Sequence, residues 1–455
     1  MSASQRSLLR RVTGWLGGIQ KRRLWRRGFR ESLATDAWTE DDIRRHDDTR
    51  LVALVRDAAT HIPFYRDLYN QAGVDAAAFR GVEDLASLPT IEKRDLVESG
   101  DRMVRPGVAD LAVVRHTTGG STGTIATMVS PRGLSSWESG CIYALWHRVG
   151  VARGDRMVVL RGALIDEGQS LFRREPGGRS LTVSTYHLND DNVGAVVDLI
   201  DGFRPDWLHV YPSAVTLLAN ILRRTGRRLG VPVKGVLCGS EMVYAWQVDL
   251  FREVFGGIVY SHYGHGELGI LGGWCKGRRE FHFLPNHGYL ELLDEAGRPV
   301  TEPGVVGEMT STGYANTVMP LIRYRTADYG AWSDPGPCPD CGRSHARLAE
   351  IEGRIQEYLV LADGTRFPLT NINALHGMFF SYVYRFQFVQ DAPGEAVLRF
   401  VPAVEMTPGR MEEIRQAFAY LGEMGLRLEF EPVERIDMTR TGKQRLVVRS
   451  EEVRP

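Results

Sequence analysis

The sequence predicts an α/β protein, and two observations carry that prediction. Five short apolar segments with the character of strands follow one another through the middle of the chain, with helical patterns between several of them: 157–160, 181–186, 207–211, 235–238 and 258–263. Such alternation is typical of parallel βαβ units, which bind ligands at the carboxyl ends of their strands. The second observation is the length, because 455 residues exceed one typical hydrophobic core and predict more than one domain.

The overall composition excludes several classes of protein. Basic and acidic residues balance at 56 each, and 43% of the residues are hydrophobic, so nucleic-acid binding is not predicted. The chain has five cysteines, no secretory signal pattern and no long uncharged apolar run. These features predict a cytoplasmic protein whose cysteines are thiols or metal ligands.

The first 30 residues (1–30) depart from this charge balance. Nine basic residues precede the first acid, Glu31: Arg6, Arg10, Arg11, Lys21, Arg22, Arg23, Arg26, Arg27 and Arg30. Apolar residues lie among them, so an amphipathic helix on an anionic membrane surface is one interpretation. However, Gly14, Gly17 and Gly18 are expected to interrupt any long helix. We therefore favour a solvated basic face that covers the main domain over membrane contact.

A segment rich in glycine and hydroxyl residues is the first candidate ligand site. Its backbone N–H groups and hydroxyls suit a cluster of anionic oxygens: Thr117, Thr118, Gly119, Gly120, Ser121, Thr122 and Gly123. Apolar residues lead in at 113–114 and out at 128–131, which predicts a loop between two strands. No Lys follows Gly123, so the segment differs from the mononucleotide P-loop. A surface hairpin of the same composition is the alternative.

Two more polar groups follow predicted strands. Gly239-Ser240-Glu241 follows the strand at 235–238, and Tyr263-Gly264-His265-Gly266-Glu267 follows the next one. An exposed tyrosine can stack on a purine, and a carboxylate close to it can bind hydrated Mg²⁺. As isolated motifs both are ordinary turn sequences. Their order along the chain therefore carries the argument.

Three further motifs complete an ordered series. They are Arg-Tyr-Arg-Thr-Ala-Asp at 323–328, Glu-Gly-Arg at 352–354 and Thr-Arg-Thr-Gly-Lys at 439–443. The series of six resembles the adenylate-forming superfamily, and most closely the phenylacetate-CoA ligase family with its capsule-biosynthesis relatives. Segments at 61–65 and 203–205 fit as well, so the resemblance covers nearly the whole chain.

The resemblance implies an architecture. A large amino-terminal domain with mixed and parallel sheets would span residues 1–352 and bind ATP and the acid. A hinge would follow at 353–357, and a small, mobile α+β lid domain with the catalytic lysine would span 358–455. A homodimer is left open.

The resemblance also implies which residues bind the nucleotide. The loop at 117–123 would hold the ATP phosphates, while Gly239, Ser240 and Glu241 would border the adenine. Tyr263, followed by Gly264, would stack on it. Asp328 would accept hydrogen bonds from the ribose hydroxyls, and Arg354 would reach the ribose or a phosphate. Ala327 stands where glycine is usual, and we expect its methyl group to be tolerated.

The implied reaction converts a carboxylic acid and ATP to an acyl-adenylate and pyrophosphate. Glu267 would bind the Mg²⁺ that neutralises the phosphates. Lys443 would bridge the substrate carboxylate and the α-phosphate, because two anions must otherwise meet unaided. Transfer to a thiol, CoA, would follow, since a thiolate is the stronger nucleophile and no histidine is placed to assist an amine.

Two departures from the family pattern keep another acceptor open. Gln356 stands where an acidic hinge residue is usual, and the Asp363-Gly364 turn resembles the capsule-type relatives. An amine or hydroxyl acceptor, giving an amide or an ester, is therefore the alternative. A non-catalytic nucleotide-binding scaffold is the rival from another class of protein.

Cysteine and histidine residues form a second constellation. Three thiolates and one imidazole would make a closed tetrahedral zinc site from Cys275, His282, Cys338 and Cys341. His287 or His345 could replace His282, and free thiols in a loop are the alternative. The other two cysteines lie on apolar stretches and are expected in the core.

Overall fold

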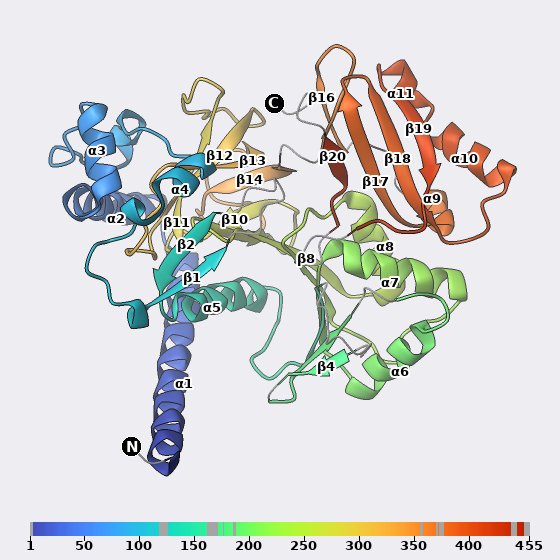
Figure 1. Cartoon of the computed structure of the whole chain (residues 1–455), viewed down its shortest axis with the longest axis horizontal. Coiled ribbons are helices and arrows are strands. Elements are labelled where there is room, and N and C mark those ends of the chain that lie inside the picture. The colour runs from blue at the N-terminus through green and yellow to red at the C-terminus, as the bar shows by residue number, and fades with distance from the viewer. Residues whose placement is uncertain are drawn as a thin grey trace. The chain divides into compact units, whose positions relative to one another are not determined.

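The structure is a computed structural model, shown in Figure 1. It describes residues 3–117, 126–161, 172–175, 177–184, 188–354, 358–369, 372, 377–437 and 444–449. The chain divides into two compact units: unit 1 comprises residues 1–151 and 262–351, and unit 2 comprises 152–261 and 352–455. Both units are therefore built from two separate stretches of the chain.

Helix α1 (Ala3–Ala34) packs along α5 (Leu134–His147) in unit 1 (Figure 1). Two glycines permit the close approach. A Cβ atom at Gly28 would lie 2.1 Å from the carbonyl oxygen of Trp137, and one at Gly140 would lie 2.1 Å from that of Trp25. Only glycine fits these two crossing points without displacing the backbone of the other helix.

The prediction that glycines interrupt the N-terminal helix is wrong. Helix α1 runs unbroken through Gly14, Gly17 and Gly18. Glycine costs about 1 kcal/mol relative to alanine in a helix interior, which weakens a helix without forbidding it. Packing of the second half of α1 against α5 stabilises the whole element, and such packing outweighs local propensity.

The amino-terminal core of unit 1 lies under α2 (Glu40–His61) and α3 (Pro63–Gln71). The spacing of apolar residues in α2 is that of one buried helix face, and Leu51, Leu54, Val55 and Ala58 are all buried. Pro63 begins α3 and separates it from α2, because proline is tolerated in the first turn of a helix but not in its interior. Shorter elements complete this part: η1 (Thr35–Ala37), η2 (Val82–Ser87), α4 (Lys93–Ser99), η3 (Gly100–Met103) and η4 (Asp110–Ala112).

The remainder of unit 1 is mainly antiparallel sheet. Strands β1 (Val113–Thr117) and β2 (Thr127–Pro131) pair antiparallel, so the prediction of two strands flanking the glycine-rich loop is confirmed. The main sheet has the order β11-β12-β13-β14-β10-β9. Its strands are β9 (Leu271–Trp274), β10 (Phe281–Phe283), β11 (Gly288–Leu293), β12 (Val306–Gly313), β13 (Tyr324–Trp332) and β14 (Arg347–Arg354).

Unit 2 contains the predicted parallel sheet. Strands β3 (Met157–Leu160), β5 (Ser180–Val183), β6 (Trp207–Val210) and β7 (Gly235–Gly239) are parallel, and β4 (Phe172–Arg174) adds an antiparallel edge. The helices between them are α6 (Val193–Phe203), α7 (Pro212–Thr225) and α8 (Ala245–Phe255). The division between the units falls inside β8 (Ile258–Gly264). All five predicted strands are thus confirmed, and the α/β class with them.

The carboxy-terminal part of unit 2 has a second, four-stranded sheet of order β19-β18-β17-β20. Its strands are β17 (Val383–Ala392), β18 (Glu395–Pro402), β19 (Arg427–Pro432) and β20 (Val447–Arg449). Helices α9 (Gly377–Tyr382), α10 (Pro408–Phe418) and α11 (Tyr420–Glu423) and the hairpin of β15 (Tyr358–Val360) and β16 (Arg366–Pro368) accompany it. Among the described residues, no helix is long and apolar enough to cross a membrane.

Candidate functional site

Two of the predicted nucleotide-binding side chains meet in unit 1. The hydroxyl of Tyr263, at the end of β8, donates a hydrogen bond of 2.5 Å to Oδ2 of Asp328 on β13. Asp328 is 4% exposed. A carboxylate has about four acceptor positions. Asp328 therefore holds the tyrosine ring in place through its carboxylate, the group type that accepts hydrogen bonds from hydroxyls.

A left-handed residue and a shift of strand register set the direction of the Asp328 side chain. The residue before it, Ala327, has φ +59°, and the pairing of β12 with β13 shifts register close by. Glu308 on β12 accepts a hydrogen bond from the N–H of Ala327 at 3.1 Å, and Thr326 Oγ1 accepts one from the N–H of Asp328. A left-handed backbone favours glycine, which accounts for the glycine of the resembled motif. In this chain alanine takes that left-handed position.

Glu267 lies in the loop after β8, next to a histidine. Its Oε2 lies 3.1 Å from Nδ1 of His265, and the ring of His265 lies 6.1 Å from that of Tyr263. Glu267 is 8% exposed. The same loop contacts the strand that leads into the glycine-rich segment, because Nε2 of His116 lies 3.2 Å from the carbonyl oxygen of Gly266. Unit 1 therefore brings together three of the predicted site residues, Tyr263, Asp328 and Glu267.

The Gly239-Ser240-Glu241 motif lies at the end of β7 in unit 2. Ser240 has a left-handed backbone with φ +68°. Glu241 accepts hydrogen bonds from the N–H and hydroxyl of Ser213 at 2.9 and 3.0 Å, in the first turn of α7. A carboxylate at a helix N-terminus is favourable because it satisfies free N–H groups. Glu241 therefore has a structural partner in addition to the predicted role.

Sequence reasoning missed a cation at this edge of the parallel sheet. Arg161 follows β3, and its Nη2 donates a hydrogen bond of 2.7 Å to Ser240 Oγ. Its guanidinium lies over the ring of Tyr211 at 4.8 Å and 3.4 Å from Nε2 of His209. Among the described residues, its buried Nε has no hydrogen-bond partner. An arginine with a spare donor at the carboxyl ends of parallel strands can bind an anion.

Several predicted site residues cannot be placed. The loop residues Thr118 to Gly123 and Lys443 lie outside the described residues, and so does the side chain of Arg354. Thr117 is described as the exposed last residue of β1. Gly264 ends β8 and directly follows the tyrosine. The roles given to all these residues stay predictions.

The four predicted zinc ligands form one cluster in unit 1. Their ligand atoms all lie within 4.8 Å of one another, in Cys275, His282, Cys338 and Cys341. The Sγ atoms of Cys275 and Cys338 are 3.8 Å apart. Arg278 ties the two cysteine segments together, because its Nε donates a hydrogen bond of 2.7 Å to Oδ2 of Asp340.

The chemistry of these groups fits a metal ion. His282 is 2% exposed, and neither ring nitrogen has a hydrogen-bond partner among the described residues. Burial lowers the pKa of His282 to about 3, so its imidazole is neutral and has a free lone pair. Burial raises the pKa of Cys275 to about 11. Burial also opposes ionisation of the Cys338 thiol. However, hydrogen bonds from the backbone N–H groups of Asp340 and Cys341 lower the pKa of Cys338 below its usual value.

Comparisons with known proteins identify relatives by sequence and a solved structure with the same fold. No protein-family model matches the sequence. Phenylacetate-coenzyme A ligase of Thermus thermophilus is 27% identical over 348 residues, which cover 74% of this chain and 75% of the relative. Protein CapK of Staphylococcus aureus is 20% identical over 376 residues, covering 81% and 80%.

A solved structure extends the comparison to the whole fold. The crystal structure of 2-hydroxyisobutyryl-CoA ligase in the postadenylation state, in complex with R3-HIB-AMP, matches with a TM-score of 0.69. The two are 22% identical, and the match covers 90% of each chain. The predicted resemblance to phenylacetate-CoA ligases and their capsule-type relatives is therefore confirmed, and the fold is that of adenylate-forming ligases.

Proposed function

We propose that this protein is an AMP-forming ligase that activates a carboxylic acid with ATP and Mg²⁺ and then transfers the acyl group to CoA. The observation that carries the proposal is the grouping of Tyr263, Asp328 and Glu267 in unit 1. Those three side chains offer a ring, a diol acceptor and a Mg²⁺ ligand, which are the groups needed to hold ATP. The relatives named phenylacetate-coenzyme A ligase support the same reaction class.

Each residue has one task in the first half-reaction. Tyr263 stacks on adenine, Asp328 accepts hydrogen bonds from the ribose hydroxyls, and Glu267 holds Mg²⁺ against the phosphates. Bound there, Mg²⁺ neutralises charge on the phosphate oxygens. The substrate carboxylate attacks the α-phosphorus, the bond to the bridging oxygen breaks, and pyrophosphate leaves. Lys443 screens the two anions from each other as they approach.

The remaining predicted nucleotide-binding residues complete the proposal. Gly239, Ser240 and Glu241 border the adenine, the loop at 117–123 holds the phosphates, and Arg354 reaches the ribose or a phosphate. In the second half-reaction the CoA thiolate attacks the acyl carbonyl carbon, and AMP leaves with the electron pair of the broken bond. We place this reaction in the cytoplasm, where ATP and CoA are available.

Acid-dependent exchange of pyrophosphate into ATP tests the first half-reaction without knowledge of the acceptor. A panel of carboxylic acids should contain at least one that supports exchange. Lys443→Ala should then remove most of the exchange while ATP still binds, because the lysine acts in the reacting complex. Lys21→Ala, which removes an exposed lysine of α1, is the matched control. ATP binding without exchange for every acid would favour the non-catalytic scaffold.

A specific observation keeps an amine or hydroxyl acceptor as the second candidate. The chain resembles CapK, and its Asp363-Gly364 turn closes the hairpin of β15 and β16, with Gly364 at φ +86°. The preferred acid, ATP and either CoA or candidate amines should be incubated together and the product identified by mass. A CoA thioester supports the ligase. If the adenylate persists with CoA but is consumed by an amine, the protein is an amide synthetase rather than a CoA ligase.

We further propose that Cys275, His282, Cys338 and Cys341 hold a structural zinc ion. Three thiolates and one neutral imidazole are a set typical of closed zinc sites. The orphaned ring nitrogens of His282 and the grouping of four ligand atoms support this assignment. Zinc would tie the segment around β10 to the loop between β13 and β14, and so would contribute to stability rather than to the reaction.

A further inference from the structure

The second half of α1 is fixed to unit 1 by one face. Trp25, Phe29 and Ser32 follow one another at three- and four-residue intervals, and Gly28 lies between them at the closest approach to α5. The rings of Trp25 and Tyr143 lie 5.4 Å apart, edge to face. Positions three and four residues apart share a helix face, so this packing fixes which way the rest of the helix points.

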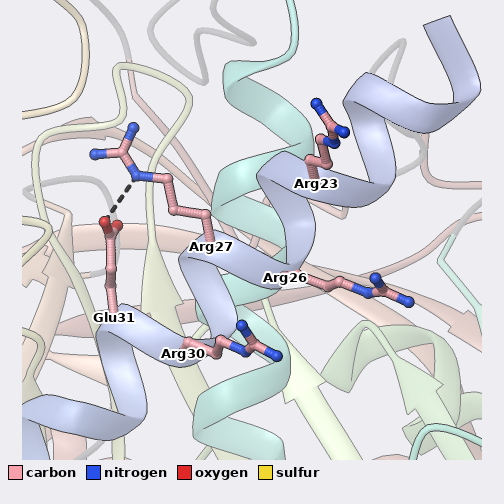
Figure 2. Close-up of a pocket in the computed structure, with 5 residues that line it drawn as sticks. All are labelled: Arg23, Arg26, Arg27, Arg30 and Glu31. Carbon is pink, nitrogen blue, oxygen red and sulfur yellow. Dashed lines mark hydrogen bonds and ion pairs between the residues drawn. The ribbon is translucent and has the colours of Figure 1, made fainter. Parts of the chain in front are cut away.

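The opposite face of α1 is cationic. Arg23, Arg26, Arg27 and Arg30 are exposed, and they line a surface pocket with Glu31 (Figure 2). Figure 2 shows Arg26 and Arg30 projecting to the same side of the helix, away from Glu31. This group of four, Arg23, Arg26, Arg27 and Arg30, is called the arginine face below.

The arginine face is almost without internal counter-charge. Arg27 pairs with Glu31 at 2.7 Å, and the other oxygen of Glu31 accepts a hydrogen bond from Nε1 of Trp137 at 3.0 Å. Within the described part of the chain, no carboxylate lies within ion-pair distance of the other three arginines. Like charges at these spacings on a helix repel one another, so the arrangement favours binding of an external anion.

The sequence continues this face with apolar residues. Towards the N-terminus, α1 carries apolar residues at three- and four-residue intervals: Leu8, Leu9, Val12, Trp15, Leu16 and Ile19. The same spacing continues beyond Ile19. Arg23 lies four residues later, Arg26 three residues after that, and Arg30 four residues after Arg26. In helical register, an apolar series therefore leads into the arginine face. Counted in helical register, the positions of that series fall on the side opposite Trp25 and Phe29.

We propose that α1 is a docking site for an anionic lipid surface. Its apolar series, which includes a tryptophan, would enter the boundary between headgroups and acyl chains, and the arginine face would bind the acidic headgroups. A nucleic acid would also bind arginines, but it offers no environment for the apolar series. Figure 1 shows α1 extending past α5 with the N-terminus at its far end, which leaves that half of the helix beyond the packed interface. The proposal rests on α1 alone and is independent of the proposed reaction.

Co-sedimentation of the full chain with vesicles tests the proposal. Binding is expected to vesicles that combine phosphatidylcholine with phosphatidylserine and not to phosphatidylcholine alone. The triple variant Arg23→Glu, Arg26→Glu, Arg30→Glu should bind at least roughly tenfold more weakly, and high salt should weaken wild-type binding as well. A matched control places the same charge change on three exposed arginines outside α1, with Arg228→Glu, Arg252→Glu and Arg435→Glu, and should retain binding.

A second variant separates lipid insertion from charge alone. Trp15→Ala should weaken binding to the acidic vesicles while leaving the salt dependence of binding unchanged, because it removes apolar surface and no charge. Both α1 variants should keep wild-type pyrophosphate exchange in solution. Equal binding of wild type and the α1 triple variant would overturn the proposal, and so would equal binding to both kinds of vesicle. If duplex DNA or RNA competes the protein off acidic vesicles and binds it more tightly at the same salt, α1 is a nucleic-acid site instead.

Discussion

Asp328 is a nearly buried carboxylate that fixes the position of a tyrosine ring. Tyr263 donates to its Oδ2, and Thr326 satisfies its backbone N–H. The position of the carboxylate is set by the left-handed backbone of Ala327, and the tyrosine ring is held by the hydrogen bond to Asp328. The pair is therefore preorganised, which reduces the entropy that ligand binding must overcome.

Replacing Asp328 should raise the KM for ATP more than replacing Tyr263. Asp328→Asn should raise the KM for ATP in pyrophosphate exchange about tenfold or more, because an amide group replaces one acceptor oxygen with a donor facing the ribose. Tyr263→Phe keeps the ring and loses one hydrogen bond of about 1 kcal/mol, so its KM should rise only about fivefold. An unchanged KM in Asp328→Asn would remove this residue from the ribose site.

Sequence reasoning succeeded at the residue scale where a motif or a spacing holds the information. The four clustered cysteine and histidine residues were recognisable because metal ligands recur at short intervals. Arg161 was missed because it belongs to no motif, and only its contact with Ser240 reveals it. Likewise, nothing in the sequence indicates that Glu241 contacts the first turn of α7 at Ser213.

The proposed zinc site joins elements that have little else in common. His282 lies in β10, which pairs with β14, while Cys338 and Cys341 lie in the loop before β14. Cys338→Ser should release zinc and lower the unfolding midpoint by on the order of 5 °C or more, because ligand loss removes metal-binding energy from the folded state.

The matched control for this change is a cysteine outside the cluster. Cys238→Ala, in β7, removes an equally buried thiol and should leave about one zinc per chain. Elemental analysis and thermal unfolding of the three proteins give the comparison. Wild-type protein that is purified without chelators and contains no zinc would refute the assignment.

The contact of α1 with α5 gives a second test at the scale of elements. Gly28→Ala should destabilise unit 1 by about 1–3 kcal/mol, because the new methyl group would overlap the carbonyl group of Trp137. Gly202→Ala in α6 is the control, since nothing lies within 4 Å of its Cβ position, and it should be neutral or slightly stabilising. Denaturant unfolding measures both. Equal effects would mean that α1 is not held at this crossing point.

Packing against α5 also stabilises α1 despite the cost of Gly14, Gly17 and Gly18, which the sequence-based prediction considered alone. Helix propensity assigns each glycine a destabilising free energy and takes no account of packing against another helix. Gly28 is favourable in α1 because it allows close packing with α5, whose sequence begins more than 100 residues later. By contrast, the boundary between α2 and α3 is a local effect, because the ring of Pro63 prevents α2 from continuing whatever packs against it.

At the scale of the whole molecule, the order of motifs predicted the fold class, while the units could not be predicted. Each unit combines two stretches that are distant in the chain, and their contacts leave no periodic pattern in the sequence. One division between the units falls at residues 351 and 352, close to the predicted start of the hinge at 353. The division into an amino-terminal domain, a hinge and a lid stays a prediction.

A buried histidine makes the stability of the molecule depend on pH. His287 is fully buried; its ring lies 5.3 Å from that of Trp137, and Nδ1 lies 3.5 Å from the carbonyl oxygen of Gly269. Burial lowers its pKa from 6.5 to about 4. Above pH 6.5 the ring is neutral in both the folded and the unfolded states, so it does not change stability there. As the pH falls from 6.5 towards 4, only the unfolded state takes up the proton, and the free energy of unfolding decreases.

We therefore expect His287→Asn to flatten the acid side of the stability profile. Between about pH 7 and pH 5 the titration of His287 should remove about 2 kcal/mol from the wild-type free energy of unfolding, at 1.36 kcal/mol per pH unit below the unfolded pKa. The variant loses this contribution but keeps every other titrating group, so the difference between the two slopes isolates one residue. Asparagine can cost stability at every pH, yet a constant cost leaves the slope unchanged. Denaturant unfolding at both pH values supplies the four free energies, and parallel profiles would mean that His287 is protonated to the same extent in the folded and the unfolded chain.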